Sequence, residues 1–193
     1  MDAPEVLVTG GTGSLGHRVV DGLRDAGSDV RALSRSGRPG TVPGDLLTGA
    51  GLESALDDVD VVVHCASSPR KTRQTDVEGT ERLLRAAPRT GLPHIVFISI
   101  VDRNPYFPYY RMKCEAERVI ERSGVPWTIL RATQFHELAL RMIQFLERLP
   151  VVTMPKGFLL QPIDIGEVAG RLVELALSAP AGRVPGCEPS ISR

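Results

Sequence analysis

Two patterns of apolar residues alternate along the chain: short continuous runs, and stretches in which an apolar residue recurs every three or four positions. The short run Val6–Val8 and the run VDVVVH at 59–64 are nearly continuous and rich in β-branched residues, which predicts strands buried on both faces of a sheet. Between such runs apolar residues recur every three or four positions, as at Leu15, Val19 and Leu23, which predicts amphipathic helices. The pattern therefore predicts a chain in which strands and helices take turns.

The predicted elements follow one another through short connections, as in βαβ units. They imply an α/β fold: a Rossmann-type, doubly wound parallel sheet with right-handed crossovers and helices on both faces. We expect one domain over residues 1–180 and an irregular tail over 181–193, where no periodicity is present. Strands are predicted at 6–8, 29–33, 59–64, 94–99, 127–130 and 151–154, with a weakly indicated one before the helix at 52–56, and further helices at 15–23, 76–87, 109–123, 134–149 and 163–178.

Composition limits the function classes. The 193 residues are 42% hydrophobic, enough for one sizeable core, and 23 basic residues balance 23 acidic ones. A chain without net charge has no strong field for nucleic acid or anionic lipid, so we expect neither partner. The first residues lead directly into a strand without a long apolar stretch, and we expect a cytoplasmic location.

Cysteine and histidine residues show no metal-ligand pattern. The three cysteines are far apart and form no C-x-x-C pair, and the four histidines are solitary. A solitary histidine is more often a hydrogen-bonded core or surface residue than a ligand. We expect neither a metal site nor a disulfide framework.

The segment VLVTGGTGSLG at 6–16 predicts a binding site for a dinucleotide. Its glycines at Gly10, Gly13 and Gly16 lie between a buried strand and a helix, and Gly11, Gly13 and Gly16 also satisfy the spacing G-x-G-x-x-G. Glycines allow a sharp turn and a close approach of backbone to ligand, while the first turn of the helix offers unpaired N–H groups to a diphosphate. The alternative is a tight turn between two core elements.

The end of the second predicted strand favours NADP(H) over NAD(H). An acid commonly accepts hydrogen bonds from the ribose hydroxyls of NAD at this place, yet the sequence here offers Ser34, Arg35, Ser36 and Arg38. A guanidinium binds a phosphate dianion that a carboxylate would repel. Arg35 is the stronger candidate, and the alternative is a solvated basic loop.

Several ordered motifs together resemble the short-chain dehydrogenase/reductase superfamily, in its atypical branch with NmrA-like and isoflavone-reductase-like proteins. They are TGGTGSLG, GDL at 44, VVVHCAS at 61, DVEGTERLL at 76, HIVFIS at 94, YYRMK at 109 and GVPWTILR at 124. The resemblance implies an NAD(P)-binding Rossmann domain. The cofactor-binding residues it implies, with those from the motifs above, are Gly10, Thr12, Gly13, Ser14, Leu15, Gly16, Ser34, Arg35, Asp45, Leu46, Cys65, Ala66, Ser67 and Lys113.

The resemblance also implies a catalytic group of Ser99, Tyr109 and Lys113. Lys113 follows Tyr109 by one helical turn, and a neighbouring ammonium makes a phenol a stronger acid, so Tyr109 is the expected general acid/base. By the same resemblance, Lys113 would also hydrogen-bond the nicotinamide ribose of the cofactor. Ser99 is expected to polarise a substrate carbonyl. Because Tyr110 is adjacent, the helix phase leaves open whether Tyr109 or Tyr110 faces the site.

Two features depart from the family pattern. Catalytically complete relatives have a fourth catalytic residue, an Asn that anchors a proton-relay water. Asp76 occupies the position of that Asn, so the complete set of four is not present here. The chain also ends soon after residue 178, where relatives continue into a larger substrate region. Either the substrate cleft is abbreviated and open, or another subunit completes it. Gln134, Phe135 and His136 are candidates to line the cleft, and Trp127 is expected to be a core residue.

The sequence leaves three function classes open. The first is an NADP(H)-dependent oxidoreductase acting on a small carbonyl or quinone-type substrate through Tyr109 and Lys113. The second is a non-catalytic NADP(H) sensor of the NmrA type, which Asp76 favours. The third, a nucleotide-sugar epimerase or dehydratase, needs a second nucleotide pocket for which this length is small. A homodimer through surface helices is expected by analogy alone.

Overall fold

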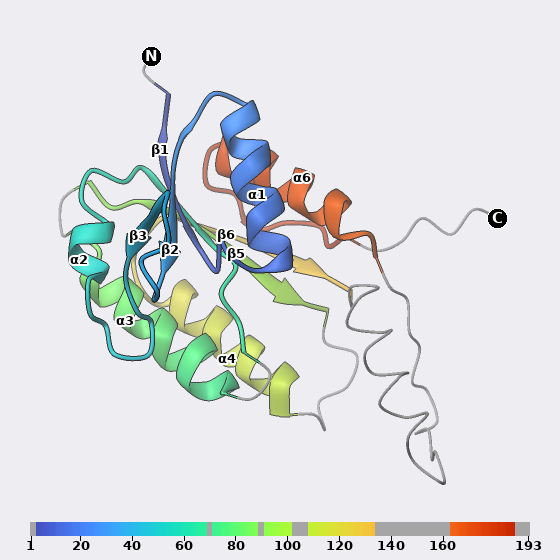
Figure 1. Cartoon of the computed structure of the whole chain (residues 1–193). Helices are drawn as coiled ribbons and strands as arrows, with labels where there is room; N and C mark the ends of the chain where they lie inside the picture. The colour runs from blue at the N-terminus through green and yellow to red at the C-terminus, as the bar shows by residue number, and fades with distance from the viewer. Residues whose placement is uncertain (1–2, 69–70, 89–90, 102–107, 134–162, 188–193) are drawn as a thin grey trace, which may run out of the picture.

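A parallel sheet of seven strands forms the centre of the described part of the molecule, in the order β3-β2-β1-β4-β5-β6-β7 (Figure 1). The computed structural model describes residues 3–68, 71–88, 91–101, 108–133 and 163–187. Every neighbouring pair of strands is parallel. The strands are β1 (Glu5–Thr9), β2 (Asp29–Ser34), β3 (Thr41–Pro43), β4 (Val61–His64), β5 (His94–Ile100), β6 (Trp127–Ala132) and β7 (Gly182–Arg183).

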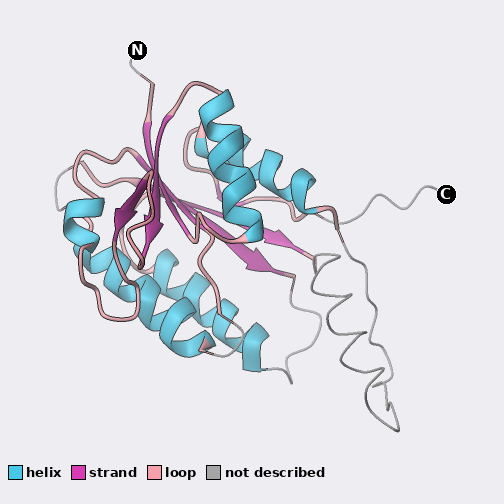
Figure 2. Cartoon of the chain, in the orientation of Figure 1, coloured by secondary structure: helices cyan, strands magenta, loops and turns pink. Residues whose placement is uncertain are grey.

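Helices cover both faces of this sheet (Figure 2). On one face lie α1 (Ser14–Asp25) and α6 (Ile165–Ala176), which pack against each other; on the other lie α2 (Leu52–Ala55), the π-helical segment η1 (Arg73–Val77), α3 (Glu78–Ala86) and α4 (Pro108–Glu121). Alternate strand residues enter the two cores, so that Val6 and Val8 pack under α1 while Leu7 faces the opposite layer. The doubly wound Rossmann architecture expected from the apolar pattern is confirmed.

Two helix ends, one at α1 and one at α6, show the cap that the sequence supplies. Gly27, with φ of 86°, closes α1, and its amide donates to the Arg24 carbonyl at 2.9 Å. At α6 the Asp164 carboxylate accepts from the amide of Gly166 at 2.7 Å and from that of Glu167 at 3.2 Å. None of the described helices combines the length and apolar character needed to cross a membrane.

Two local expectations need correction. The helix expected over 76–87 begins as the π-helical η1 at Arg73, within which Asp76 is buried, and becomes α-helical only at Glu78. Within the expected irregular tail, Gly182–Arg183 pair with β6 as β7. The single-domain boundary at residue 180 itself stays a prediction, and the elements expected at 134–149 and 151–154 lie outside the described residues.

The strand order reverses beside β1, and this reversal locates the site. From β1 the chain proceeds to β2 and β3 in one direction, then returns to place β4, β5 and β6 on the other side. The loops after β1 and β4 consequently separate at the carboxyl ends of two adjacent strands, where doubly wound folds form their ligand crevice.

Candidate functional site

A glycine cradle joins β1 to α1 at the carboxyl edge of the sheet. Gly10 has φ of 68°, and a Cβ added there would lie 2.8 Å from the Ala66 nitrogen, so the loop packs tightly on the segment after β4. A Cβ on Gly16 would collide with the Gly10 carbonyl, which explains how α1 approaches so closely. Because the N-cap residue is Gly13, no side chain caps α1, and the first amides of the helix are available to an anion.

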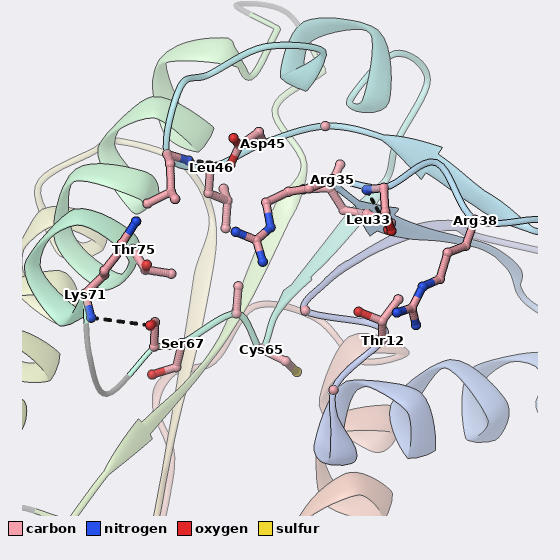
Figure 3. A pocket seen from close by; sticks show the side chains of 18 residues that line it. Thr12, Leu33, Arg35, Arg38, Asp45, Leu46, Cys65, Ser67, Lys71 and Thr75 are labelled. Atoms are coloured by element: carbon pink, nitrogen blue, oxygen red, sulfur yellow. Dashed lines mark hydrogen bonds between the residues drawn. The ribbon is translucent and has the colours of Figure 1, made fainter.

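A pocket of about 740 Å³ opens above this cradle (Figure 3). Its walls come from the loops after β1, β2, β3 and β4 and from the start of η1. The expected cofactor-binding residues that line it are Gly10, Thr12, Gly13, Ser34, Arg35, Asp45, Leu46, Cys65, Ala66 and Ser67. Ser14, Leu15 and Gly16 do not line it with side chains and form the first turn of α1.

The wall after β2 presents two guanidinium groups. The Ser36 amide donates to the Ser34 hydroxyl at 3.3 Å, which turns the chain at the end of β2 and directs Arg35 toward the middle of the pocket (Figure 3). Arg38 lies on the same wall. Of the described lining residues only Asp45 is acidic, and its carboxylate accepts the Leu47 amide at 2.9 Å. The expected basic end of β2 therefore belongs to the pocket.

Tyr109, rather than Tyr110, contacts a residue of the pocket wall. The Tyr109 hydroxyl lies 3.4 Å from the Ser67 Oγ, which lines the pocket, whereas Tyr110 is 9% exposed and packs edge-on against Tyr109 with ring centroids 6.0 Å apart. The helix phase left open by the sequence is thus settled in the structure.

Lys113 is held inside the fold. Its Nζ lies 2.8 Å from the Asp76 Oδ1, donates to the Ile98 carbonyl at 3.4 Å and sits 4.9 Å from the centre of the Phe97 ring. Burial lowers the pKa of Lys113, but the Asp76 carboxylate, with smaller effects of Tyr109 and Cys65, raises it, so the pKa is raised overall and the ammonium stays charged. Lys113 is not among the residues that line the pocket.

A buried hydrogen-bond network connects Asp76 to the glycine loop. His64 Nδ1 lies 2.6 Å from the Thr9 hydroxyl, His64 Nε2 lies 2.9 Å from the Thr80 hydroxyl, and Thr80 donates to the Asp76 carbonyl. Burial, with a smaller effect of Lys113, lowers the pKa of His64 to about 3, so the ring is neutral. Burial likewise raises the pKa of the pocket residue Cys65 to about 12, which leaves a thiol without nucleophilic character.

Ser99 belongs to a different cluster under α4. It is 4% exposed beside Glu117, whose carboxylate takes two bonds from Arg131, at 2.9 and 2.6 Å, and one from Arg183 at 2.6 Å. Burial raises the pKa of Glu117, but the interactions of its carboxylate, chiefly the hydrogen bonds from Arg131 and Arg183, outweigh burial and lower the pKa overall. This cluster fastens α4 to β6 and β7. None of the three expected catalytic residues is among the residues that line the pocket, but the Tyr109 hydroxyl lies 3.4 Å from the lining residue Ser67.

Sequence reasoning missed Lys71, Ser68 and Thr75 on the pocket wall and the pairing of Asp76 with Lys113. The available signal was the segment SSPRKTRQTD, which follows a buried strand at the edge where ligands bind. The candidates Gln134, Phe135 and His136 lie outside the described residues, while Trp127 packs against the core as expected. No group of three metal-ligating side chains occurs within the described ranges.

A parallel sheet, a glycine cradle and a pocket at the reversal of strand order define a nucleotide-binding Rossmann protein. Residues 10–148 match the model of the NAD(P)H-binding family, and the chain belongs to that family, within the short-chain dehydrogenase/reductase superfamily. A short-chain dehydrogenase/reductase superfamily protein from Agrobacterium tumefaciens with bound NAD has the same fold, with a TM-score of 0.72, 23% identity and coverage of 93% of this chain and 76% of that one.

Two relatives show how function varies in this family. The photosystem II assembly factor Ycf39 of Synechocystis is 34% identical over 146 residues, covering 67% of this chain and 44% of that protein. A (4-alkanoyl-5-oxo-2,5-dihydrofuran-3-yl)methyl phosphate reductase of Streptomyces griseus is 35% identical over 143 residues, covering 67% and 48%. The chain thus spans about half the length of these curated relatives.

Proposed function

We propose that the protein is an NADP(H)-dependent oxidoreductase that acts on a small carbonyl or quinone-type acceptor. The observation that carries the proposal is the pocket wall after β2, where Arg35 points into the cavity, Arg38 stands beside it and no carboxylate is present. A 2′-phosphate has two negative charges, and a guanidinium offers it paired donors. The phosphorylated coenzyme therefore fits this wall better than NAD(H) does.

The cradle suits the diphosphate of such a coenzyme. The uncapped amides at the start of α1 and the positive end of its dipole favour an anion, and Gly10 and Gly13 line the pocket with backbone alone. The pocket of about 740 Å³ has the size of a cofactor site. Asp45 and Leu46 line the wall on which the resemblance to the superfamily would place the adenine.

The position of Tyr109 supports redox chemistry. When bound, the coenzyme would supply or accept the hydride. The Tyr109 hydroxyl, beside Ser67 of the pocket wall, would exchange the proton with the substrate oxygen. Sequence similarity to the reductase of Streptomyces griseus also supports a redox reaction. The substrate in the name of that reductase belongs to that protein and is not assigned to this chain.

Calorimetric titration with NADPH and NADH tests the coenzyme preference. We expect NADPH to bind at least about 10-fold tighter, a difference of about 1.4 kcal/mol, and Arg35→Ala to remove most of this difference. Arg122→Ala is the matched control, because Arg122 is exposed in the turn after α4 and does not line the pocket. Equal affinities for the two coenzymes in the wild type would contradict the proposal.

A second candidate is a coenzyme-responsive binding protein without turnover. The buried Asp76–Lys113 pair favours it, because the ammonium that short-chain dehydrogenases use beside their tyrosine is here occupied by a carboxylate. Incubation of the protein with NADPH and a panel of carbonyls and quinones separates the two candidates. Tight NADPH binding with no substrate-dependent oxidation of NADPH would favour the binding protein.

A further inference from the structure

Ser67 lies on the pocket wall in a loop that buried groups hold on both sides. Its side chain is exposed to the cavity, yet both flanking amides are fixed from below: the Ala66 amide donates to Thr9 Oγ1 at 3.3 Å, and the Ser68 amide donates to Asp76 Oδ2 at 3.4 Å. Thr9 and Asp76 are joined in turn by the His64–Thr80 network. The loop that carries Ser67 is consequently held by buried groups on both sides.

The same network removes Lys113 from the cavity. Asp76 uses one carboxylate oxygen for the Ser68 amide and the other for the Lys113 ammonium, 2.8 Å away. The Lys113 ammonium also has the Ile98 carbonyl as a partner and is only 3% exposed. To reach a ligand it would have to leave a buried counter-ion, at a cost of several kcal/mol.

We propose that Ser67, together with Tyr109, holds the ribose hydroxyls on the nicotinamide side of the coenzyme, the role that the superfamily resemblance gives to Lys113. The hydroxyls of Ser67 and Tyr109 lie 3.4 Å apart at the pocket wall, from two different elements, and each can both donate and accept. A ribose diol between them would replace their weak mutual contact with a hydrogen bond on each side. The inference rests on the proposed use of NADP(H) and goes beyond it by naming the group that orients the reactive half.

Two ligands that share the 2′-phosphate isolate this contact. NADPH contains the nicotinamide riboside, and adenosine 2′,5′-bisphosphate lacks it. The ratio of the two affinities therefore reports on the nicotinamide half of the coenzyme. In Ser67→Ala we expect NADPH to bind about fivefold more weakly, from the loss of one uncharged hydrogen bond, and the bisphosphate to bind as in the wild type. Ser67→Thr, which keeps a hydroxyl, should restore most of the loss.

The controls separate Ser67 from Lys113. Ser178→Ala, an exposed serine at the end of α6, should change neither affinity. The double variant Asp76→Asn with Lys113→Met removes the buried pair without leaving a lone charge and keeps at position 76 a side-chain oxygen that can accept the Ser68 amide, so we expect its affinity ratio to stay within about twofold of wild type. A changed ratio in the double variant with an unchanged ratio in Ser67→Ala would overturn the inference and return the role to Lys113.

This readout is independent of the test of Arg35. If NADPH and NADH bind equally but Ser67→Ala still weakens NADPH selectively, the coenzyme preference is wrong and the ribose contact stands. If Arg35 behaves as proposed and Ser67→Ala weakens both ligands equally or neither, the contact is wrong and the coenzyme preference stands. Absence of NADPH binding to the wild type would overturn both.

Discussion

Asp76 Oδ1 and Lys113 Nζ are 2.8 Å apart and almost fully buried, and they join the π-helical turn after β4 to the helix after β5. The pair fixes α4 relative to the pocket wall. It also gives the acid at position 76 a physical role, as the counter-ion of a lysine that would otherwise be a buried, unpaired charge. The ion pair therefore accounts both for the acid at position 76, which departs from the family pattern, and for the buried position of Lys113.

Breaking this pair from one side is expected to be costly. Asp76→Asn should lower the free energy of unfolding by about 3 kcal/mol, because it leaves the Lys113 ammonium without a counter-ion. Asp76→Asn combined with Lys113→Met should lose less than the sum of the two single losses, by more than about 1 kcal/mol. Urea unfolding of the wild type, Asp76→Asn, Lys113→Met and the double variant measures this double-mutant cycle. Strict additivity would mean that the two side chains do not interact.

Acid should destabilise the protein through His64. The folded ring resists protonation down to about pH 3, whereas the ring in the unfolded chain takes a proton near its ordinary pKa of 6.5. The unfolded state then binds more protons, so stability falls as pH drops from about 6.5 toward 3, at up to about 1.4 kcal/mol per pH unit. His64→Gln should have a shallower slope between pH 6.5 and 4 in urea titrations. His94 is present in both proteins and cancels; identical slopes would show that His64 titrates normally.

The close packing of the glycine loop predicts a difference between two left-handed glycines. Gly10 and Gly27 both have positive φ, but a Cβ at Gly10 would meet Ala66 backbone atoms at 2.8 Å, whereas one at Gly27 meets nothing within 4 Å. Gly27→Ala should cost about 1 kcal/mol of stability from backbone strain alone. Gly10→Ala should cost at least about 1 kcal/mol more and also weaken NADPH binding. Equal costs would argue that the loop is not packed against the segment after β4.

The strand–glycine–helix unit could be predicted from sequence because its determinants are local. Three apolar residues, glycines at fixed spacing and a helical apolar stripe specify β1, the loop and α1 without reference to the rest of the chain. The basic end of β2 could be placed for the same reason, since a parallel strand directs its last residues to the ligand edge.

The catalytic geometry could not be predicted in this way. Ser99, Tyr109 and Lys113 have suitable spacing, but whether each side chain reaches the pocket depends on how α4 packs over η1 and β5. That packing involves contacts between positions far apart in sequence, such as Asp76 with Lys113 and Ser99 with Glu117. β7 has only two residues, too few for a periodic signal, and is held by Arg183 bonding to Glu117 and Glu121.

Two adjacent tyrosines give a matched test of the proposed chemistry. Tyr109→Phe removes the hydroxyl that lies beside Ser67 and should lower the NADPH oxidation rate with an active carbonyl or quinone by about 100-fold or more, the usual range for a lost general acid. Tyr110→Phe removes a hydroxyl from a buried ring and should keep the rate within about threefold. Equal rates in the wild type and both variants would exclude Tyr109 as the proton donor.

The central claim is that an NADP(H) diphosphate lies on the first turn of α1 while its 2′-phosphate lies at Arg35. A crystal structure of the protein with NADPH measures this most directly. We predict phosphate oxygens within hydrogen-bond distance of the backbone amides at the start of α1, and the 2′-phosphate within reach of the Arg35 guanidinium. A coenzyme bound elsewhere, or a cradle filled by protein side chains at saturating NADPH, would contradict the account.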